Sequence, residues 1–204
     1  MKHKIGLIYV IIVLIISCNG RISNKAKTGD IYFIGNLFNR TYNAVSGIKE
    51  RDHYLYPEIY SDSKMIFKDT STTFYNLNSK ENQLVEVKNL LNQFYILLDT
   101  SDPPEADKWV ILKINDNKVV SYQKAIKQLL MDLDNDGFLE VGGFDVIDAY
   151  CLDCDSAYYN PAQIYKLGNE FKFDEVSSEI VTKQIYGVYL GNERKDTVLK
   201  VYKK

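Results

Sequence analysis

The chain has few of the side chains that most often carry catalysis or bind transition metals, with three cysteines, two histidines and one tryptophan in 204 residues. It contains no Gly-x-Ser-x-Gly elbow, no P-loop and no His-Glu-x-x-His motif. His53 has no acidic or nucleophilic partner at a recognised spacing, which favours a structural role. The sequence therefore supports none of the enzyme classes that these motifs identify.

The chain also has little excess charge of either sign and few prolines. The chain has 25 lysines and arginines against 27 aspartates and glutamates, and it has no basic stripe, which excludes nucleic acid as an expected partner. Only four prolines accompany sixteen tyrosines and nine phenylalanines, a balance that favours strands over disorder. Without internal repeats, the sequence predicts one mainly β domain over residues 30–204, a compact antiparallel sheet with minor α content.

No hydrophobic run is long enough to cross a membrane, which needs about 20 apolar residues. The longest run, Ile5 to Ile16, instead follows the basic start Met1 to Lys4 and precedes the small residue Ser17. This order is typical of a secretory signal peptide, here an apolar helix over residues 1–17. Ile15-Ile16-Ser17-Cys18 resembles the lipobox of bacterial lipoproteins, and the resemblance implies that Cys18 is lipidated and becomes the mature N-terminus.

The resemblance implies a place for the mature protein on a membrane surface, in the bacterial cell envelope. Acyl chains contribute roughly 0.8 kcal/mol per buried methylene and would anchor the chain without spanning the bilayer. Residues 18–29 are polar and predict a flexible tether. Asn19-Gly20-Arg21 carries no acidic residue after the cysteine, which within this class of lipoproteins favours the periplasmic face of the outer membrane.

Cys151 and Cys154 remain for the domain itself. An exported protein sits where disulfides persist, so a local disulfide is one interpretation of the pair, and two free thiols are another. A zinc site would need more ligands than these two thiols and His53 provide, because structural zinc usually takes four.

The rest of the chain predicts short strands separated by turn residues. Asn115-Asp116-Asn117 predicts the turn of one hairpin, and Gly168-Asn169 the turn of another. Residues 125–133 fit either a helix or a strand. The expected strands cover residues 31–34, 72–77, 83–87, 94–98, 109–114, 118–122, 138–141, 144–147, 162–167 and 171–173, with a closing pair over 186–190 and 197–202.

One helix is predicted over Asp174 to Gln184. Asp174 is a suitable N-cap, because its carboxylate can accept a hydrogen bond from an amide of the first turn. Val176, Ile180, Val181 and Gln184 fall near a common side of this helix and are the expected buried face.

The strongest internal motif is the nine-residue segment that runs from Asp132 to Glu140, Asp-Leu-Asp-Asn-Asp-Gly-Phe-Leu-Glu. Calcium takes six to eight oxygen ligands, and carboxylates at alternate positions of a tight loop can converge on it. Gly137 permits the sharp bend. The candidate ligands are the carboxylates of Asp132, Asp134, Asp136 and Glu140 and the backbone carbonyl of Phe138, whose side chain is then free to enter the core.

An EF-hand would need a glutamate at the twelfth position, where this chain has Gly143. The acid at the ninth position makes the segment similar to the calcium loops of FG-GAP (integrin-type) β-propeller repeats, in which the loop joins two strands. The similarity covers ten to fifteen residues, and one copy cannot form a propeller of roughly four to eight blades. An Asp-rich turn that remains solvated is the alternative, because Asp, Asn and Gly are common in turns.

The lipobox, the single loop and the composition together resemble small lipoproteins of Bacteroidota. Three functions remain open. The first is a non-enzymatic anchored domain with a structural calcium ion that binds a protein or glycan or supports the envelope. The second is a metal-dependent hydrolase that uses the acidic cluster over residues 132–155. The third is a thiol-active protein that uses Cys151 and Cys154.

Overall fold

The computed structural model describes residues 31–48, 55–71, 73–101, 106–145, 156–195 and 197–200. Within these ranges the protein is mainly β, with antiparallel sheets and a single α-helix, which confirms the predicted fold class. None of the described helices is long and apolar enough to cross a membrane. The predicted signal peptide and tether, His53 and the pair Cys151 and Cys154 lie outside the described residues.

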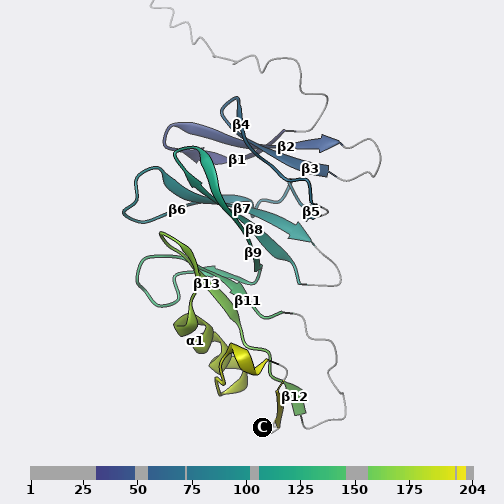
Figure 1. Ribbon diagram of the computed structural model, residues 1–204, viewed down its shortest axis with the longest axis vertical. Coiled ribbons are helices and arrows are strands. Elements are labelled where there is room, and N and C mark those ends of the chain that lie inside the picture. Colours follow the sequence, from purple (N-terminus) through teal and green to yellow (C-terminus); the bar gives the residue numbers. More distant parts are fainter. Residues whose placement is uncertain are drawn as a thin grey trace, which may run out of the picture.

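Three sheets are stacked on one another, and the helix lies beyond the third (Figure 1). The first sheet is a meander of β1 (Ile31–Leu37), β2 (Arg40–Ile48), β3 (Leu55–Ser61) and β4 (Lys64–Lys68). The second contains β5 (Phe74–Tyr75), β6 (Gln83–Glu86), β7 (Gln93–Ser101), β8 (Lys108–Asn115) and β9 (Lys118–Ile126), with β5 and β6 both paired to β7.

The third sheet has the order β10-β11-β13-β14, formed by β10 (Leu129–Met131), β11 (Glu140–Gly143), β13 (Gln163–Leu167) and β14 (Phe171–Phe173). The helix α1 (Glu175–Tyr186) follows directly. A 3-10 turn, Asn192–Arg194, and the small pair of β12 (Ser156–Tyr158) with β15 (Val198–Lys200) complete the described chain.

The central strands of the middle sheet, β7 and β8, are buried on both faces. Because successive side chains of a strand point to opposite sides, Phe94, Ile96 and Leu98 of β7 pack against the first sheet. Tyr95 and Leu97 of the same strand pack against the third sheet. This double burial explains why β7 is continuously apolar instead of alternating.

Aromatic side chains link the layers. The Tyr42 ring of the first sheet meets Phe94 edge-on, with 5.0 Å between ring centroids. On the other face, the buried Tyr95 hydroxyl donates a 2.8 Å hydrogen bond to the Gly168 carbonyl at the turn of the β13–β14 hairpin. The hairpin that carries much of the candidate site is therefore held by the middle sheet.

The helix forms where it was predicted and begins with the predicted cap, since Asp174 accepts a hydrogen bond from the Ser177 amide. The predicted buried face is wrong except for Val181: Val176 and Ile180 are exposed. Hydroxyl groups face the sheet instead. The Ser178 hydroxyl accepts from the Ile164 amide at 3.1 Å and the Thr182 hydroxyl from the Ala162 amide at 2.9 Å, so the helix satisfies backbone donors of the neighbouring strand segment.

Both predicted hairpins are confirmed. β8 and β9 are joined at Asp116 and Asn117, whose φ values of 47° and 60° fit a tight turn, and β13 pairs with β14. The ambiguous segment 125–133 forms no helix: residues 125–126 end β9, residues 127–128 form a turn, and residues 129–131 form β10.

Of the closing pair of strands predicted over 186–190 and 197–202, the second is found as β15 (Val198–Lys200), whereas the first is wrong and so is the pairing of the two. The helix continues to Tyr186, whose ring packs against Tyr159, and Gly187 ends it in the left-handed region at φ 72°. Residues 187–190 form no strand, and β15 pairs with β12.

The strand expected from Phe138 begins only at Glu140, because the Phe138 amide donates back into the loop, to Asp136.

The strand expected over 144–147 is also wrong in its described part. The backbone of Phe144 is bound by the Gln128 side chain, which accepts from its amide at 2.7 Å and donates to its carbonyl at 2.9 Å. β11 therefore ends at Gly143, and residues 146–147 lie outside the described ranges.

Candidate metal centre

The acidic loop joins β10 to β11, two neighbouring strands of the third sheet. Its own carboxylates hold its shape. Asp132 accepts from the amides of Asp136 at 3.1 Å and Gly137 at 2.9 Å, and Asp136 accepts from the Phe138 amide at 2.9 Å. Gly137 has the positive φ, 86°, that its place in the motif predicted.

The structure brings three of the predicted ligands together. One carboxylate oxygen from each of Asp132, Asp134 and Asp136 lies within 4.8 Å of the other two. The Phe138 side chain is half-buried and packs against the core between the second and third sheets, as expected. The predicted ligation by its backbone carbonyl stays a prediction.

Glu140, the fourth predicted carboxylate, is the first residue of β11 and is fully buried. Its Oε2 accepts a 2.7 Å hydrogen bond from the Leu133 amide. Its Oε1 is buried and has no hydrogen-bond partner in the described part of the chain. Burial raises the pKa of Glu140, and the neighbouring carboxylates of Asp134 and Asp136 act in the same direction, against the Leu133 amide and Lys166.

Asp174 is a fifth carboxylate at the centre, and sequence analysis gave it only the role of helix cap. An oxygen of Asp174 lies within 4.8 Å of oxygens from Asp134 and Glu140. The β13–β14 hairpin places it there, because its amide donates to the Ile164 carbonyl and the chain then turns into α1. Asp134 belongs to both groups of three carboxylates and connects the loop to this inner group.

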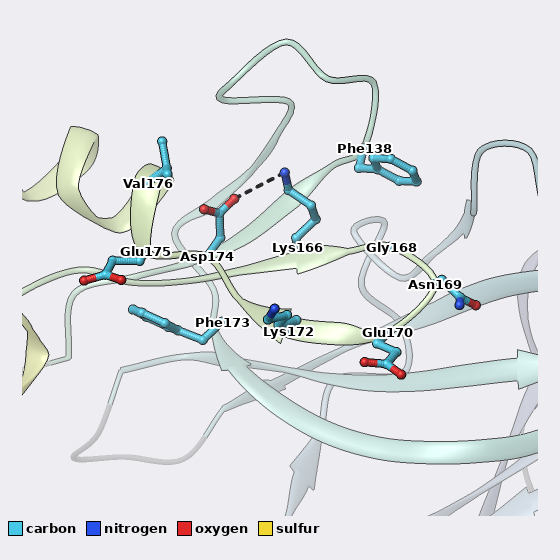
Figure 2. Close-up of a pocket in the computed structure, with 10 residues that line it drawn as sticks. All are labelled: Phe138, Lys166, Gly168, Asn169, Glu170, Lys172, Phe173, Asp174, Glu175 and Val176. Carbon is cyan, nitrogen blue, oxygen red and sulfur yellow. Dashed lines mark ion pairs between the residues drawn. The ribbon is translucent and has the colours of Figure 1, made fainter.

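Lys166 is the second residue that sequence reasoning missed. It lies directly opposite Glu140 in the pairing of β11 with β13, and facing residues of an antiparallel pair project to the same side of the sheet. Its Nζ is 2.8 Å from Asp134, 2.6 Å from Asp136, 3.5 Å from Asp174 and 3.8 Å from Glu140 Oε1. Figure 2 shows the ion pair between Lys166 and Asp174.

The charges at this centre do not balance. Lys166 contributes one positive charge against five carboxylates, and a second ammonium, Lys88, reaches only the Asp136 carbonyl at 3.5 Å. Desolvation lowers the pKa of Lys166, but its hydrogen bonds to Asp134 and Asp136 outweigh this and raise that pKa. The hydrogen bond from Lys166 lowers the pKa of Asp136. An arrangement with this excess of oxygen ligands and negative charge is suited to a hard divalent cation.

A cavity of about 790 Å³ opens beside the centre. Its walls come from Phe138, the β13–β14 hairpin and the start of α1 (Figure 2). Lys166 and Asp174 line the cavity and also belong to the group of charged side chains at the centre.

Of the other residues in the predicted acidic cluster, Asp145 is described and belongs to neither group of carboxylates. Asp145 lies 3.3 Å from Lys195, with which it forms an ion pair. Asp148, Asp153 and Asp155 of the wider acidic cluster lie outside the described residues, as do Cys18, Cys151 and Cys154. Comparison of the chain with models of known protein families, with curated proteins and with solved structures found no match.

Proposed function

We propose that this chain is a lipid-anchored, extracytoplasmic protein of the bacterial cell envelope whose β-rich domain is stabilised by a calcium ion at the 132–140 loop. The domain would act as a binding or structural module, with an envelope protein or a glycan as its partner, and not as an enzyme. The observation that carries the calcium assignment is Glu140: its fully buried Oε1 lacks a hydrogen bond and lies in a group of carboxylates.

The physical argument rests on the cost of leaving such a group without a partner. An unsatisfied buried acceptor costs roughly 1–3 kcal/mol, and more when it is charged. A calcium ion among Asp132, Asp134, Asp136 and Glu140 would remove this cost and the repulsion between the carboxylates. Its bonds would then connect the loop to β11, so the ion would have a structural role.

Calcium should therefore stabilise the protein. At a free calcium concentration of about 100 times the dissociation constant, the free energy of unfolding rises by about 2.7 kcal/mol. For a chain of this size, the melting temperature then rises by roughly 5–10 °C. The measurement is thermal unfolding of the purified full chain in detergent, with calorimetric titration of calcium and with magnesium as the control ion. A melting temperature and heat signal that ignore millimolar calcium would contradict the proposal.

The anchor has a separate test. Cells given a labelled fatty acid should incorporate it into the wild-type chain and into Cys151→Ala, but not into Cys18→Ala, because Cys18 follows the lipobox residues Ile15 to Ser17. Fatty-acid labelling is the right measurement because a chain that keeps its apolar leader would remain with the membrane in any case. Label in Cys18→Ala equal to that in the other two chains would show that Cys18 is not the lipidated residue.

A further inference from the structure

We propose that Lys166 is an internal cation that occupies the centre when calcium is absent and is displaced from it when calcium binds, and that Asp174 joins the calcium ligands in the exchange. The inference rests on the proposed calcium function and specifies how the site is regulated. Its starting point is the position of the Lys166 ammonium, which lies within 4 Å of four carboxylates that come from the loop, β11 and the helix cap.

A lysine ammonium fills this site incompletely. It has three N–H donors, and two close contacts, to Asp134 and Asp136 at 2.8 and 2.6 Å, use two of them. Asp174 at 3.5 Å and Glu140 Oε1 at 3.8 Å remain at long distances. The buried Glu140 oxygen consequently has an opposite charge nearby but no hydrogen bond. Calcium accepts six to eight oxygens at about 2.3–2.6 Å and can use all of these ligands together.

The ammonium has room to leave. The Lys166 side chain is 26% exposed, and it lines the cavity of about 790 Å³ next to the centre. Glu170 and Glu175 line the same cavity and offer alternative carboxylates to a displaced ammonium. A lysine has a flexible four-carbon stem, so the exchange needs rotation about side-chain bonds and no movement of β13.

Asp174 would extend the site to the helix. Its two carboxylate oxygens accept from the amide and the hydroxyl of Ser177 at 3.1 and 3.0 Å, and each oxygen can accept a further interaction. When Lys166 leaves, the Asp174 oxygen next to Asp134 and Glu140 becomes available to calcium. The ion would then connect the loop to the N-terminus of α1, which lies more than thirty residues further along the chain.

Competition by Lys166 should weaken calcium binding. Only those molecules whose site is free of the Lys166 ammonium can bind calcium, and the apparent affinity falls in proportion to their fraction. The variant Lys166→Met, which keeps the apolar stem, should bind calcium about 10-fold or more tightly than the wild type. Lys88→Met is the matched control, since Lys88 approaches the loop at the Asp136 carbonyl without occupying the carboxylate group. We expect this control to change affinity less than about 3-fold, as for a charge in high dielectric.

A second variant tests Asp174. Serine is as good an N-cap as aspartate, so Asp174→Ser retains the cap and removes the carboxylate. Its calcium affinity should fall about 10-fold or more. An affinity equal to that of the wild type would exclude Asp174 from the ligands.

A measurement on the unmodified full chain guards against variants that do not fold. Acetylation by acetic anhydride, followed by mass spectrometry, reports the free amine of each lysine. Calcium should raise the rate at Lys166 at least about 3-fold, because displacement exposes its ammonium, and should leave the rate at Lys88 unchanged. A constant or lower rate at Lys166 in the calcium-bound chain overturns the exchange.

The outcomes separate the two proposals. If neither the wild type nor Lys166→Met binds calcium, the calcium function itself is wrong. If calcium binds, but Lys166→Met is no tighter than the wild type or no tighter than Lys88→Met, the calcium function stands and the exchange is wrong. Tighter binding by Lys166→Met alone, together with the calcium-dependent acetylation, supports the exchange.

Discussion

The variant Glu140→Gln is expected to lose the calcium response of the wild type and to be more stable than the wild type without calcium. The first effect follows because the substitution removes one of the proposed ligand carboxylates, which lies in a group with Asp134 and Asp174. The second follows because the Glu140 side chain is fully buried and its Oε1 has no hydrogen bond. An amide of the same shape is neutral, can still accept from the Leu133 amide through its oxygen and can donate to a neighbouring carboxylate.

The stabilisation of the calcium-free chain should be about 1–3 kcal/mol, the usual cost of an unsatisfied buried polar group. Thermal unfolding with and without calcium measures both effects. Glu86→Gln is the matched control, since Glu86 is an exposed glutamate on β6 and lies outside both carboxylate groups. A Glu140→Gln chain that keeps the full calcium shift, or that is less stable than the wild type without calcium, would contradict this assignment.

Leu97→Ala and Leu98→Ala should each lower the free energy of unfolding by about 2–5 kcal/mol, which is the range for a buried leucine replaced by alanine. Both side chains are fully buried and adjacent on β7, yet they fill different cores. Leu98 faces the first sheet, whereas Leu97 faces the third sheet and packs in the core that contains Val141 and Leu167. The two substitutions should therefore lower the free energy of unfolding by similar amounts but loosen different parts of the protein.

Amide hydrogen exchange in the native state shows which part of the protein each substitution loosens. Leu97→Ala should reduce protection in β11 and β13, which carry Glu140 and Lys166, and should also weaken calcium binding. Leu98→Ala should reduce protection in β2 and β3 and leave calcium affinity within about 3-fold of the wild type. Identical exchange patterns in the two variants would show that the two cores do not open independently.

The sequence predicted those elements whose information is local. The Asn115–Asn117 turn, the cap at Asp174 and the bend at Gly137 each depend on the preferences of one or a few residues. The strands β2 to β4 were missed, and for β2 the reason is that its inward positions are weakly apolar. In β2 the buried side chains are Tyr42, Ala44 and Ser46, so alternation does not appear as a hydrophobic pattern.

The candidate centre was predicted in the same partial way. Asp132 to Glu140 lie within nine residues and form a recognisable spacing, and the structure brings their carboxylates into two groups that share Asp134. Lys166 and Asp174 reach the centre through the pairing of β11 with β13 and the register of the β13–β14 hairpin. Glu140 and the Lys166 opposite it are 26 positions apart in the sequence (166 − 140), and pairing over such a distance leaves no mark in the spacing of either segment.

The double burial of the middle sheet constrains the order in which the chain can fold. The first sheet ends at Lys68, but the face that contains Tyr42 and Ile59 finds most of its fully buried partners on β7 and β8, which end at Asn115. A chain made from its N-terminus therefore completes an entire sheet before the surface that covers it exists. The hairpins of β7, β8 and β9 pair residues that are close in the sequence and can form early. The first and third sheets, which come before and after these strands in the sequence, can then dock on the two faces of the middle sheet.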